Sequence, residues 1–315
     1  MSKVSFPPGA SRRPSSDAVA DVALNKVEGV RSSRFGVRLR TRARGRALVA
    51  GSLAGLVLWQ VLAVIVGAVT AQGAQIVPPL PTIFTSGVTG LSHFYQGGLG
   101  PATTIQGAPD SVGLAALAVG QNGLVTLVRF WAGYLLAVGL GLPAGLLVAG
   151  ARPVRHAVGG VGGLLRMLPL LAMAPLFTLW FGATGRAAVL FVTFGAFWVV
   201  LLATSNAVAN LPSHVTDYPR TLGLGPVRLR TRVILPAVLP QLRGALMLAA
   251  GTAWACVLAS ELYGIQSGLG WALNQTLVYS LVDQMIVLAL LFAGLSLASL
   301  RLVDAVTGHL TRWTE

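Results

Sequence analysis

Residues 47–69 read ALVAGSLAGLVLWQVLAVIVGAV, a stretch without a single charged side chain. A bilayer core about 30 Å thick is crossed by roughly 20 apolar residues in an α-helix, so this stretch predicts a transmembrane helix. The rest of the 315-residue chain has the same character, because 54% of its residues are hydrophobic, only 10% are charged and its mean hydropathy is +0.74. So few charges cannot cover a soluble fold with a hydrated surface, which excludes a water-soluble protein.

Five further windows between charged residues are long enough, or nearly so, to hold a transmembrane helix. They cover residues 130–151, 167–185, 187–216, 244–260 and 284–300. With the first, they predict an all-α, polytopic membrane protein of about six transmembrane helices, organised as a first helix at 47–69 and a five-helix core at 122–305.

Two other stretches are predicted to lie outside the membrane on its outer side. Window 262–282 is long enough to span, but its Gln, Asn, Ser and Thr side chains would be costly against lipid, so we expect a loop, with a re-entrant course left open. In segment 70–121 the sequences VPPLP and GGLGP interrupt any long helix, so we expect an extracytoplasmic connection with short interfacial helices.

The positions of the basic residues predict the orientation. With the N-terminus inside, 20 of the 23 Lys and Arg residues lie on the cytoplasmic side, as the positive-inside rule requires. Both termini, including the C-terminal segment 306–315, are therefore expected in the cytoplasm. The tail 1–46 holds 11 of these basic residues among Ser and Pro, which favours disorder and contact with anionic lipid rather than with nucleic acid.

Several kinds of chemistry are excluded by residues that the sequence lacks. A phosphate-binding P-loop needs a lysine after its glycines, and the only lysines are Lys3 and Lys26 in the tail. If ATP drives this protein, a separate chain must bind it. The four histidines lie in the outer loop or at cytoplasmic helix ends, and Cys256 is the single cysteine, so we expect no hydrolase site, metal site or bound cofactor.

The five-helix core contains one long basic loop, which lies within segment 210–243. Together with the residues that follow it, the loop reads DYPRTLGLGPVRLRTRVILPAVLPQLRGAL over residues 217–246. Asp217 to Leu222 can form a short helix, Gly223 supplies a turn, and Pro226 can begin a second helix. Leu235 and Pro236 then begin the approach to the next span. Such a helix-turn-helix on the cytoplasmic face suits a docking surface for a soluble partner, although an ordinary basic loop is the alternative.

This loop resembles the EAA loop of ABC importer permeases, in which EAA, three residues, Gly, nine residues and Ile-x-Leu-Pro follow one another. Asp217, Tyr218 and Pro219 stand in the EAA place, and the glycine and the Leu-Pro pair follow at the required spacing. The resemblance implies that the loop inserts into a cleft of an ATPase subunit. The implied coupling residues are Asp217, Tyr218, Pro219, Thr221, Leu222, Gly223, Leu235 and Pro236.

The resemblance extends over about residues 76–305. IVPPLPTIFTSGV, LVRFWAGYLLAVGLGLPAGLLVAG, LLRMLPLLAMAPLFTLWFGATGRAAV and ASELYGIQSGLGWAL are similar to segments of the nitrate, sulfonate, taurine and bicarbonate branch. It implies a permease subunit, itself not an enzyme, that dimerises in a bacterial inner membrane. The implied partners are a dimer of ABC ATPase subunits, an extracytoplasmic substrate-binding protein and lipid. The implied cargo is a small anion, with a sulfonate as the first candidate.

Charged and aromatic residues near membrane depth are candidates for the translocation pathway. Arg129, Arg166 and Glu261 qualify because an unpaired charge there is costly and usually faces a partner or water. Arg129 and Glu261 are expected near outer helix ends, where they could instead snorkel to the surface, and Arg166 near an inner end. Trp254 could stack on substrate or belong to an aromatic belt.

Glycines and prolines in the second and third spans predict close helix packing and a distorted helix. Gly141 with Gly145, and Gly159 with Gly163, have the spacing that lets helices approach closely. Pro169 and Pro175 are expected to loosen the third span.

Two other functions of a membrane protein require features that differ from those of an ABC permease. An ion-coupled secondary transporter would show repeated halves or an intramembrane carboxylate relay, and only Glu261 and Asp283 are acidic near the outer ends of the last two spans. A membrane scaffold that transports nothing would not need the basic loop motif.

Overall fold

A computed structural model describes residues 50–70 and 73–312, and within these ranges the chain is helical and contains no strand. Five helices are long and apolar enough to cross a membrane, and a bent pair of helices makes six if it counts as one span. The prediction of an all-α protein with about six spans is confirmed. The chain divides into two units, one ending at Ile65 and the other beginning at Val66.

The first long helix runs from Ala50 to Val69. Most of its large side chains are exposed, among them Leu58 at 70% and Val69 at 81%, as expected of a helix whose solvent is lipid. The predicted tail 1–46, together with residues 47–49, lies outside the described residues.

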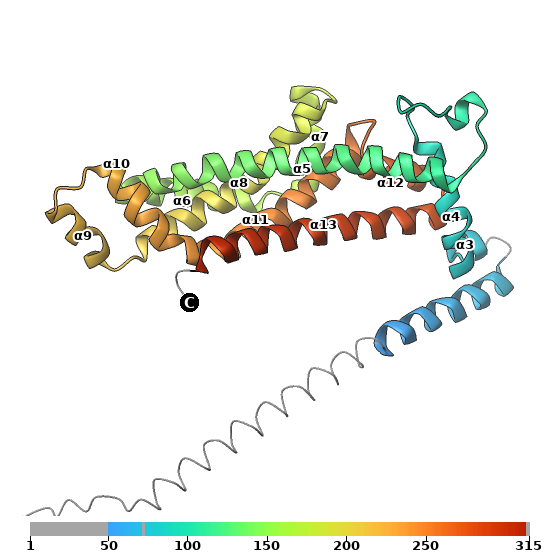
Figure 1. Cartoon of the computed structure of the whole chain (residues 1–315), viewed down its shortest axis with the longest axis horizontal. Coiled ribbons are helices and arrows are strands. Elements are labelled where there is room, and N and C mark those ends of the chain that lie inside the picture. Colours follow the sequence, from blue (N-terminus) through green and yellow to red (C-terminus); the bar gives the residue numbers. More distant parts are fainter. Residues whose placement is uncertain (1–49, 71–72, 313–315) are drawn as a thin grey trace, which may run out of the picture. The chain divides into compact units, whose positions relative to one another are not determined.

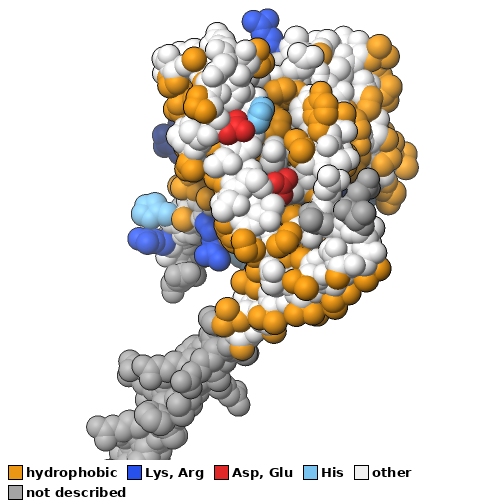
Figure 2. Space-filling view, turned by 90° about the vertical axis from the view of Figure 1, so that its right-hand side faces the viewer, with side chains coloured by type: hydrophobic (Ala, Val, Ile, Leu, Met, Phe, Trp, Pro, Cys, Tyr) orange, Lys and Arg blue, Asp and Glu red, His pale blue; other side chains and the backbone are white. Residues whose placement is uncertain are grey.

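The second unit is built on four long helices: α5 (Val112–Val148), α8 (Gly185–Ala209), α11 (Leu235–Tyr263) and α13 (Val282–Leu310). They lie side by side along the bundle (Figure 1). Their shared core contains Phe130, Phe191, Ala250 and Val257, each fully buried. Many large apolar side chains of the long helices are exposed, as a bundle within lipid requires. Figure 2 looks onto the end of the bundle at the right of Figure 1, where few charged side chains are visible.

Small residues allow α5 and α8 to pack closely. A Cβ atom added at Gly141 would lie 2.9 Å from the Val200 Cβ, and one added at Gly145 would lie 2.6 Å from the Thr204 Cβ. The packing role expected for these two glycines is confirmed. Gly159 and Gly163 do not behave in this way, because a Cβ at either position would meet no atom within 4 Å.

Helix α5 begins earlier than the sequence windows suggested. It starts at Val112, where the Ser111 side chain accepts a hydrogen bond from the Leu114 N–H, and it continues through Arg129. Residues 112–121, which were expected in the extracytoplasmic connection, are therefore helical. The charge at Arg129 does not end the span because it is neutralised inside the protein.

The third span is broken rather than straight. Helices α6 (Arg152–Met167) and α7 (Leu170–Phe181) meet at an angle of 97°. Proline at 169 lacks an N–H group and forces the preceding Leu168 into an extended conformation, with φ −62° and ψ 133°, which ends α6. The window between Arg166 and Arg186 thus holds one helix, α7, whose 12 residues are too few to span a membrane without α6. Pro175 lies inside α7 without breaking it.

The last two spans extend beyond their bounding charges at the end of the bundle opposite Arg129 and Glu261. The Arg243 side chain, in α11, donates two hydrogen bonds of 2.8 and 3.0 Å to the Asp304 carboxylate in α13. Because these charges pair, both helices continue past them. The boundaries expected at 243 and 305 therefore fall inside helices.

Short elements occupy the two ends of the second unit. Helices α2 (Gly73–Ile76), α3 (Leu80–Phe84) and α4 (Ser86–Thr89) and two 3-10 turns, η1 (Gly90–Phe94) and η2 (Thr104–Gln106), precede α5, as the Pro and Gly pattern predicted. Helix α12 (Leu269–Val278) has ten residues, too few to span a membrane, so window 262–282 holds no transmembrane helix. At the opposite end lie α9 (Ser213–Thr221), α10 (Pro226–Leu229) and the π-helical turn η3 (Arg230–Ile234) (Figure 1).

Candidate functional site

Residues 213–229, which we call the coupling segment, form the helix-turn-helix that the sequence predicted. The turn is closed by two hydrogen bonds, from the Gly223 N–H to the Arg220 carbonyl and from the Leu224 N–H to the Pro219 carbonyl. Gly223 has φ +78°, a left-handed conformation that only glycine adopts without strain. The turn therefore depends on this one residue.

The departure from the EAA pattern does not disrupt the first helix of the coupling segment. Tyr218 and Pro219 lie inside α9, and the helix continues to Thr221, whose hydroxyl donates a 2.7 Å hydrogen bond to the Tyr218 carbonyl. Asp217 lies 3.8 Å from Arg220 in a pair that is largely exposed.

The coupling segment presents apolar side chains to its surroundings. Tyr218, Leu222 and Val227 are 69%, 63% and 68% exposed. Leu235 and Pro236 are only half-buried parts of the first turn of α11, after the turn η3, so they belong to the base of the segment rather than to its tip. The structure thus separates the eight predicted coupling residues into an exposed tip and a packed base.

At the other end of the bundle, Arg129 and Glu261 form a buried ion pair. The Arg129 Nη1 donates a 2.7 Å hydrogen bond to the Glu261 Oε1, and the two side chains are 7% and 0% exposed. Neither side chain snorkels to the surface, so that alternative was wrong. Both charges neutralise one another inside the protein.

Further hydrogen bonds link this pair to the turn at 267–270, and we call the whole arrangement the polar network. The Arg129 guanidinium donates to the Ser267 carbonyl and hydroxyl, at 2.7 and 2.6 Å. The Gly270 N–H donates to the Glu261 Oε2 at 2.9 Å, and the Leu269 N–H donates to the Thr126 hydroxyl at 2.9 Å. The network therefore fastens the turn after α11 to the middle of α5.

Asn122 and Thr126 are members of this network that sequence reasoning missed. Asn122 accepts from the Gly268 N–H at 2.9 Å and donates to the Phe94 carbonyl at 3.1 Å. A signal was present, because residues 122, 126 and 129 follow the spacing of one helix face. The partners on the turn could not be seen, since they are far away in sequence.

The glycines of the turn are required by the close approach of Glu261. Gly268 has φ +101°, and a Cβ atom there would collide with the Glu261 carboxylate. A Cβ at Gly270 would lie 2.7 Å from the Glu261 Cβ. The Gly-Leu-Gly sequence thus gives the carboxylate room, and its Gly270 N–H donates a hydrogen bond to the carboxylate.

The two other pathway candidates lie elsewhere. Trp254 is 4% exposed and stacks on Phe130 with ring centroids 4.6 Å apart, so it belongs to the core. Arg166 is in the last turn of α6, beside Gly195 of α8 and Thr252 of α11. Gly195 and Thr252 lie near the middle of their helices, and the Arg166 side chain is exposed.

A bundle of apolar helices with an exposed helix-turn-helix at one end and a buried polar network at the other defines a polytopic membrane protein. Residues 141–314 match the family model described as "Binding-protein-dependent transport system inner membrane component". The chain belongs to this family, and it is a permease subunit of the ABC importer class.

Two relatives of this chain carry names that state what they transport. SsuC of Bacillus subtilis, whose name assigns it to aliphatic sulfonates transport, is 30% identical over 59% of this chain and 63% of its own length. The bicarbonate transport permease CmpB of Synechococcus elongatus is 26% identical over 84% of this chain and 87% of its own. A solved structure of the inward-facing MetNI methionine ABC transporter aligns with a TM-score of 0.49 at 24% identity, over 62% of this chain and 99% of that one. The chain is thus similar to permeases named for sulfonate and for bicarbonate transport.

Proposed function

We propose that this chain is the membrane subunit of an ATP-driven, binding-protein-dependent importer of a small anion. Two copies form the translocation pathway, two ATPase subunits bind at their cytoplasmic faces, and an extracytoplasmic binding protein delivers the substrate. Family membership supports this arrangement, and the ATP is bound and hydrolysed by the partner subunits. Nucleic acid has no part in it, and lipid surrounds the helices.

The geometry of the coupling segment is the observation that carries the proposal. Its turn at Gly223 holds α9 and α10 beyond the end of the long helices and leaves Tyr218, Leu222 and Val227 exposed (Figure 1). Exposed aromatic and aliphatic side chains on a preformed two-helix surface suit insertion into a groove of a protein partner. Closure of the ATPase subunits would then move α11 through its base at Leu235 and Pro236.

The test of coupling is Gly223→Val, because valine at φ +78° costs about 1–2 kcal/mol or more and would distort the turn. We expect the complex reconstituted with its ATPase and binding protein to lose most of its uptake, while the chain still inserts into the membrane. Uptake and binding-protein-stimulated ATP hydrolysis should be measured together in proteoliposomes.

Gly225→Val is the matched control. Gly225 has φ −65° and, as at Gly223, an added Cβ would meet nothing within 4 Å, so the same side chain fits there without backbone strain. This variant should retain most of the uptake. Full transport by Gly223→Val would show that the turn does not couple the partner to the helices.

For the substrate we propose a small oxyanion, with a sulfonate first and nitrate and bicarbonate as alternatives. The supporting relatives are named for aliphatic sulfonates and for bicarbonate. Cells with and without the gene should be supplied with a sulfonate, nitrate or an uncharged nutrient as the sole source of sulfur or nitrogen. We expect deletion to abolish uptake of one anion, and loss of the uncharged nutrient alone would refute the anion assignment while leaving the permease assignment intact.

The ion-coupled alternative receives no support from Glu261. Its carboxylate is held by Arg129, Thr126 and the Gly270 N–H, so it is a fixed partner of a buried cation rather than a free site for a coupling ion.

A further inference from the structure

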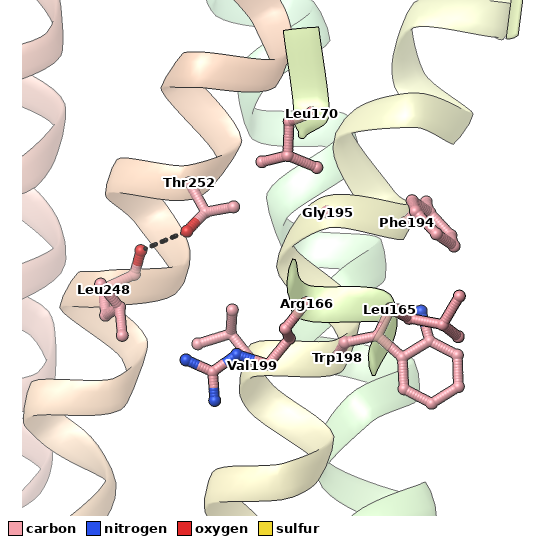
Figure 3. Close-up of a pocket in the computed structure, with 9 residues that line it drawn as sticks. All are labelled: Leu165, Arg166, Leu170, Phe194, Gly195, Trp198, Val199, Leu248 and Thr252. Atoms are coloured by element: carbon pink, nitrogen blue, oxygen red, sulfur yellow. Dashed lines mark hydrogen bonds between the residues drawn. The ribbon is translucent and has the colours of Figure 1, made fainter. Parts of the chain in front are cut away.

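A small cavity lies where the third span is broken, between α6, α7, α8 and α11. Its volume is about 140 Å³, and Leu165, Arg166, Leu170, Gly195, Leu248 and Thr252 are among the residues that line it. Figure 3 shows the Arg166 side chain extending from the end of α6 toward α11, while the Trp198 indole turns the other way. We call this space the break cavity.

Arg166 brings a cation without a counter-ion to the break cavity. Among the described residues, none forms an ion pair or a hydrogen bond with its guanidinium. The other arginine near membrane depth, Arg129, is neutralised by Glu261. The Arg166 side chain is exposed in the single chain, and an unpaired charge within a membrane is costly, so such groups usually face an ion or substrate pathway.

The break adds a second group that favours an anion. The first hydrogen bonds of α7 are donated by Ala172 and Met173 to the Pro169 carbonyl, so the N–H groups of Leu170 and Leu171 precede them. No side chain caps this helix start. The free N–H groups and the helix dipole attract negative charge, and discontinuous helices near the bilayer middle commonly direct such ends at anionic substrates.

Gly195 keeps the space open on the α8 side. A Cβ atom there would collide with the Cys256 Sγ and would lie 3.6 Å from the Thr252 Cγ2 and 3.7 Å from the Leu170 Cδ2. A larger residue would therefore fill the gap between α7, α8 and α11. The remaining lining is mostly aliphatic.

We propose that the break cavity is a binding subsite for the translocated substrate, a small oxyanion that carries a short apolar part. The planar guanidinium of Arg166 can donate two parallel hydrogen bonds to a sulfonate or carboxylate group, the α7 N-terminus adds positive potential, and the aliphatic side chains receive the apolar part. This inference rests on the proposed permease function. A lipid phosphate is the other source of such chemistry, but headgroups lie at the bilayer surfaces, whereas the cavity lies beside the middle of α8 and α11.

The test compares anionic and cationic thiol reagents at one introduced cysteine. In the assembled transporter with Cys256→Ala and Thr252→Cys, we would measure modification rates with a sulfonate-bearing and a trimethylammonium-bearing methanethiosulfonate, with and without ATP. Replacing Arg166 by Gln should lower the ratio of the anionic to the cationic rate about tenfold, because one charge a few ångströms away is removed. Arg166→Lys should retain most of the ratio, and ethanesulfonate should slow modification only while Arg166 is present.

Arg152→Gln is the matched control, since Arg152 is an exposed arginine in the first turn of the same helix. It should leave the ratio unchanged. Any of four results would overturn the subsite. They are an unchanged ratio in Arg166→Gln, no protection by ethanesulfonate, protection by short-chain phosphatidic acid instead, and no modification in either nucleotide state. None of these results would affect the uptake loss expected for Gly223→Val, so the subsite and the proposed function fail separately.

Discussion

The buried ion pair between Arg129 and Glu261 changes the role that the sequence suggests for these two residues. In the sequence alone, each of these two charged residues lies near a helix end and is compatible with snorkelling or with a pathway role. As a pair 2.7 Å apart that also holds Ser267 and Gly270, they fix the turn after α11 on α5. Their role is therefore to position this turn, whatever passes through the transporter.

Removing one member of this pair should destabilise the protein strongly. Glu261→Ala leaves the Arg129 charge buried without a partner, which typically costs about 3–5 kcal/mol. We expect a clearly lower midpoint of thermal unfolding in detergent. The midpoint is measured by size-exclusion chromatography, as the amount of monodisperse protein that remains after heating. A midpoint equal to that of the wild type would contradict the structural role assigned to the network.

Asp304→Ala is the control for this prediction. It breaks the Arg243–Asp304 pair, whose side chains are 43% and 42% exposed, so solvent screens much of their interaction. Such pairs typically contribute about 1 kcal/mol or less. The comparison separates the effect of burial from the effect of losing a carboxylate.

At the scale of elements, glycine positions decide which helix faces meet. The α5 glycines at 141 and 145 face α8 at distances that exclude any side chain, whereas Gly159 and Gly163 of α6 have the same spacing and face open space. The small-xxx-small pattern therefore indicates a possible contact, and only the neighbouring helix determines whether it is used.

Gly141→Leu should separate α5 from α8, because its Cβ alone would approach Val200 within 2.9 Å. We expect misfolding or a large loss of protein in the membrane fraction, on the scale of about 1–3 kcal/mol or more for overpacking. Gly139→Leu places the same side chain two residues away on an exposed position where a Cβ would meet nothing within 4 Å. Equal amounts of folded protein for the two variants would argue against close α5–α8 packing.

The break between α6 and α7 is also an element-scale property. Proline at 169 is visible in the sequence and predicts a weakness in the helix, but proline at 175 is equally visible and lies inside an intact α7. The difference lies in what surrounds each position. At the break, α8 and α11 line the cavity that receives the Arg166 side chain.

At the scale of the whole molecule, the orientation in the membrane is still a prediction. We expect a cysteine at Arg228, in the exposed α10, to react with a membrane-impermeant reagent only from the cytoplasm, in a Cys256→Ala background. A cysteine at Ile105, which is 92% exposed at the opposite end, should react only from outside. Intact cells and inverted vesicles distinguish the two, and the reverse pattern would refute the topology drawn from the basic residues.

The sequence by itself determined the class, the helical spans and the coupling segment, because these depend on local quantities. Apolar length specifies a membrane helix, and Gly223 between two short helices specifies a turn wherever the chain lies. The spacing of that turn from Leu235 and Pro236 also carried the family resemblance.

Only the tertiary structure decided the partners of the intramembrane charges and the ends of the helices. Arg129 and Arg166 are the same residue type in similar apolar sequence, yet one is neutralised by Glu261 and the other lines a cavity. Helices α5 and α11 continue through charges that seemed to bound them, because Arg129 and Glu261 pair with each other and Arg243 pairs with Asp304 of α13. The reason is physical: the cost of a charge in a low-dielectric interior depends on what lies within a few ångströms of it, and those neighbours are distant in sequence.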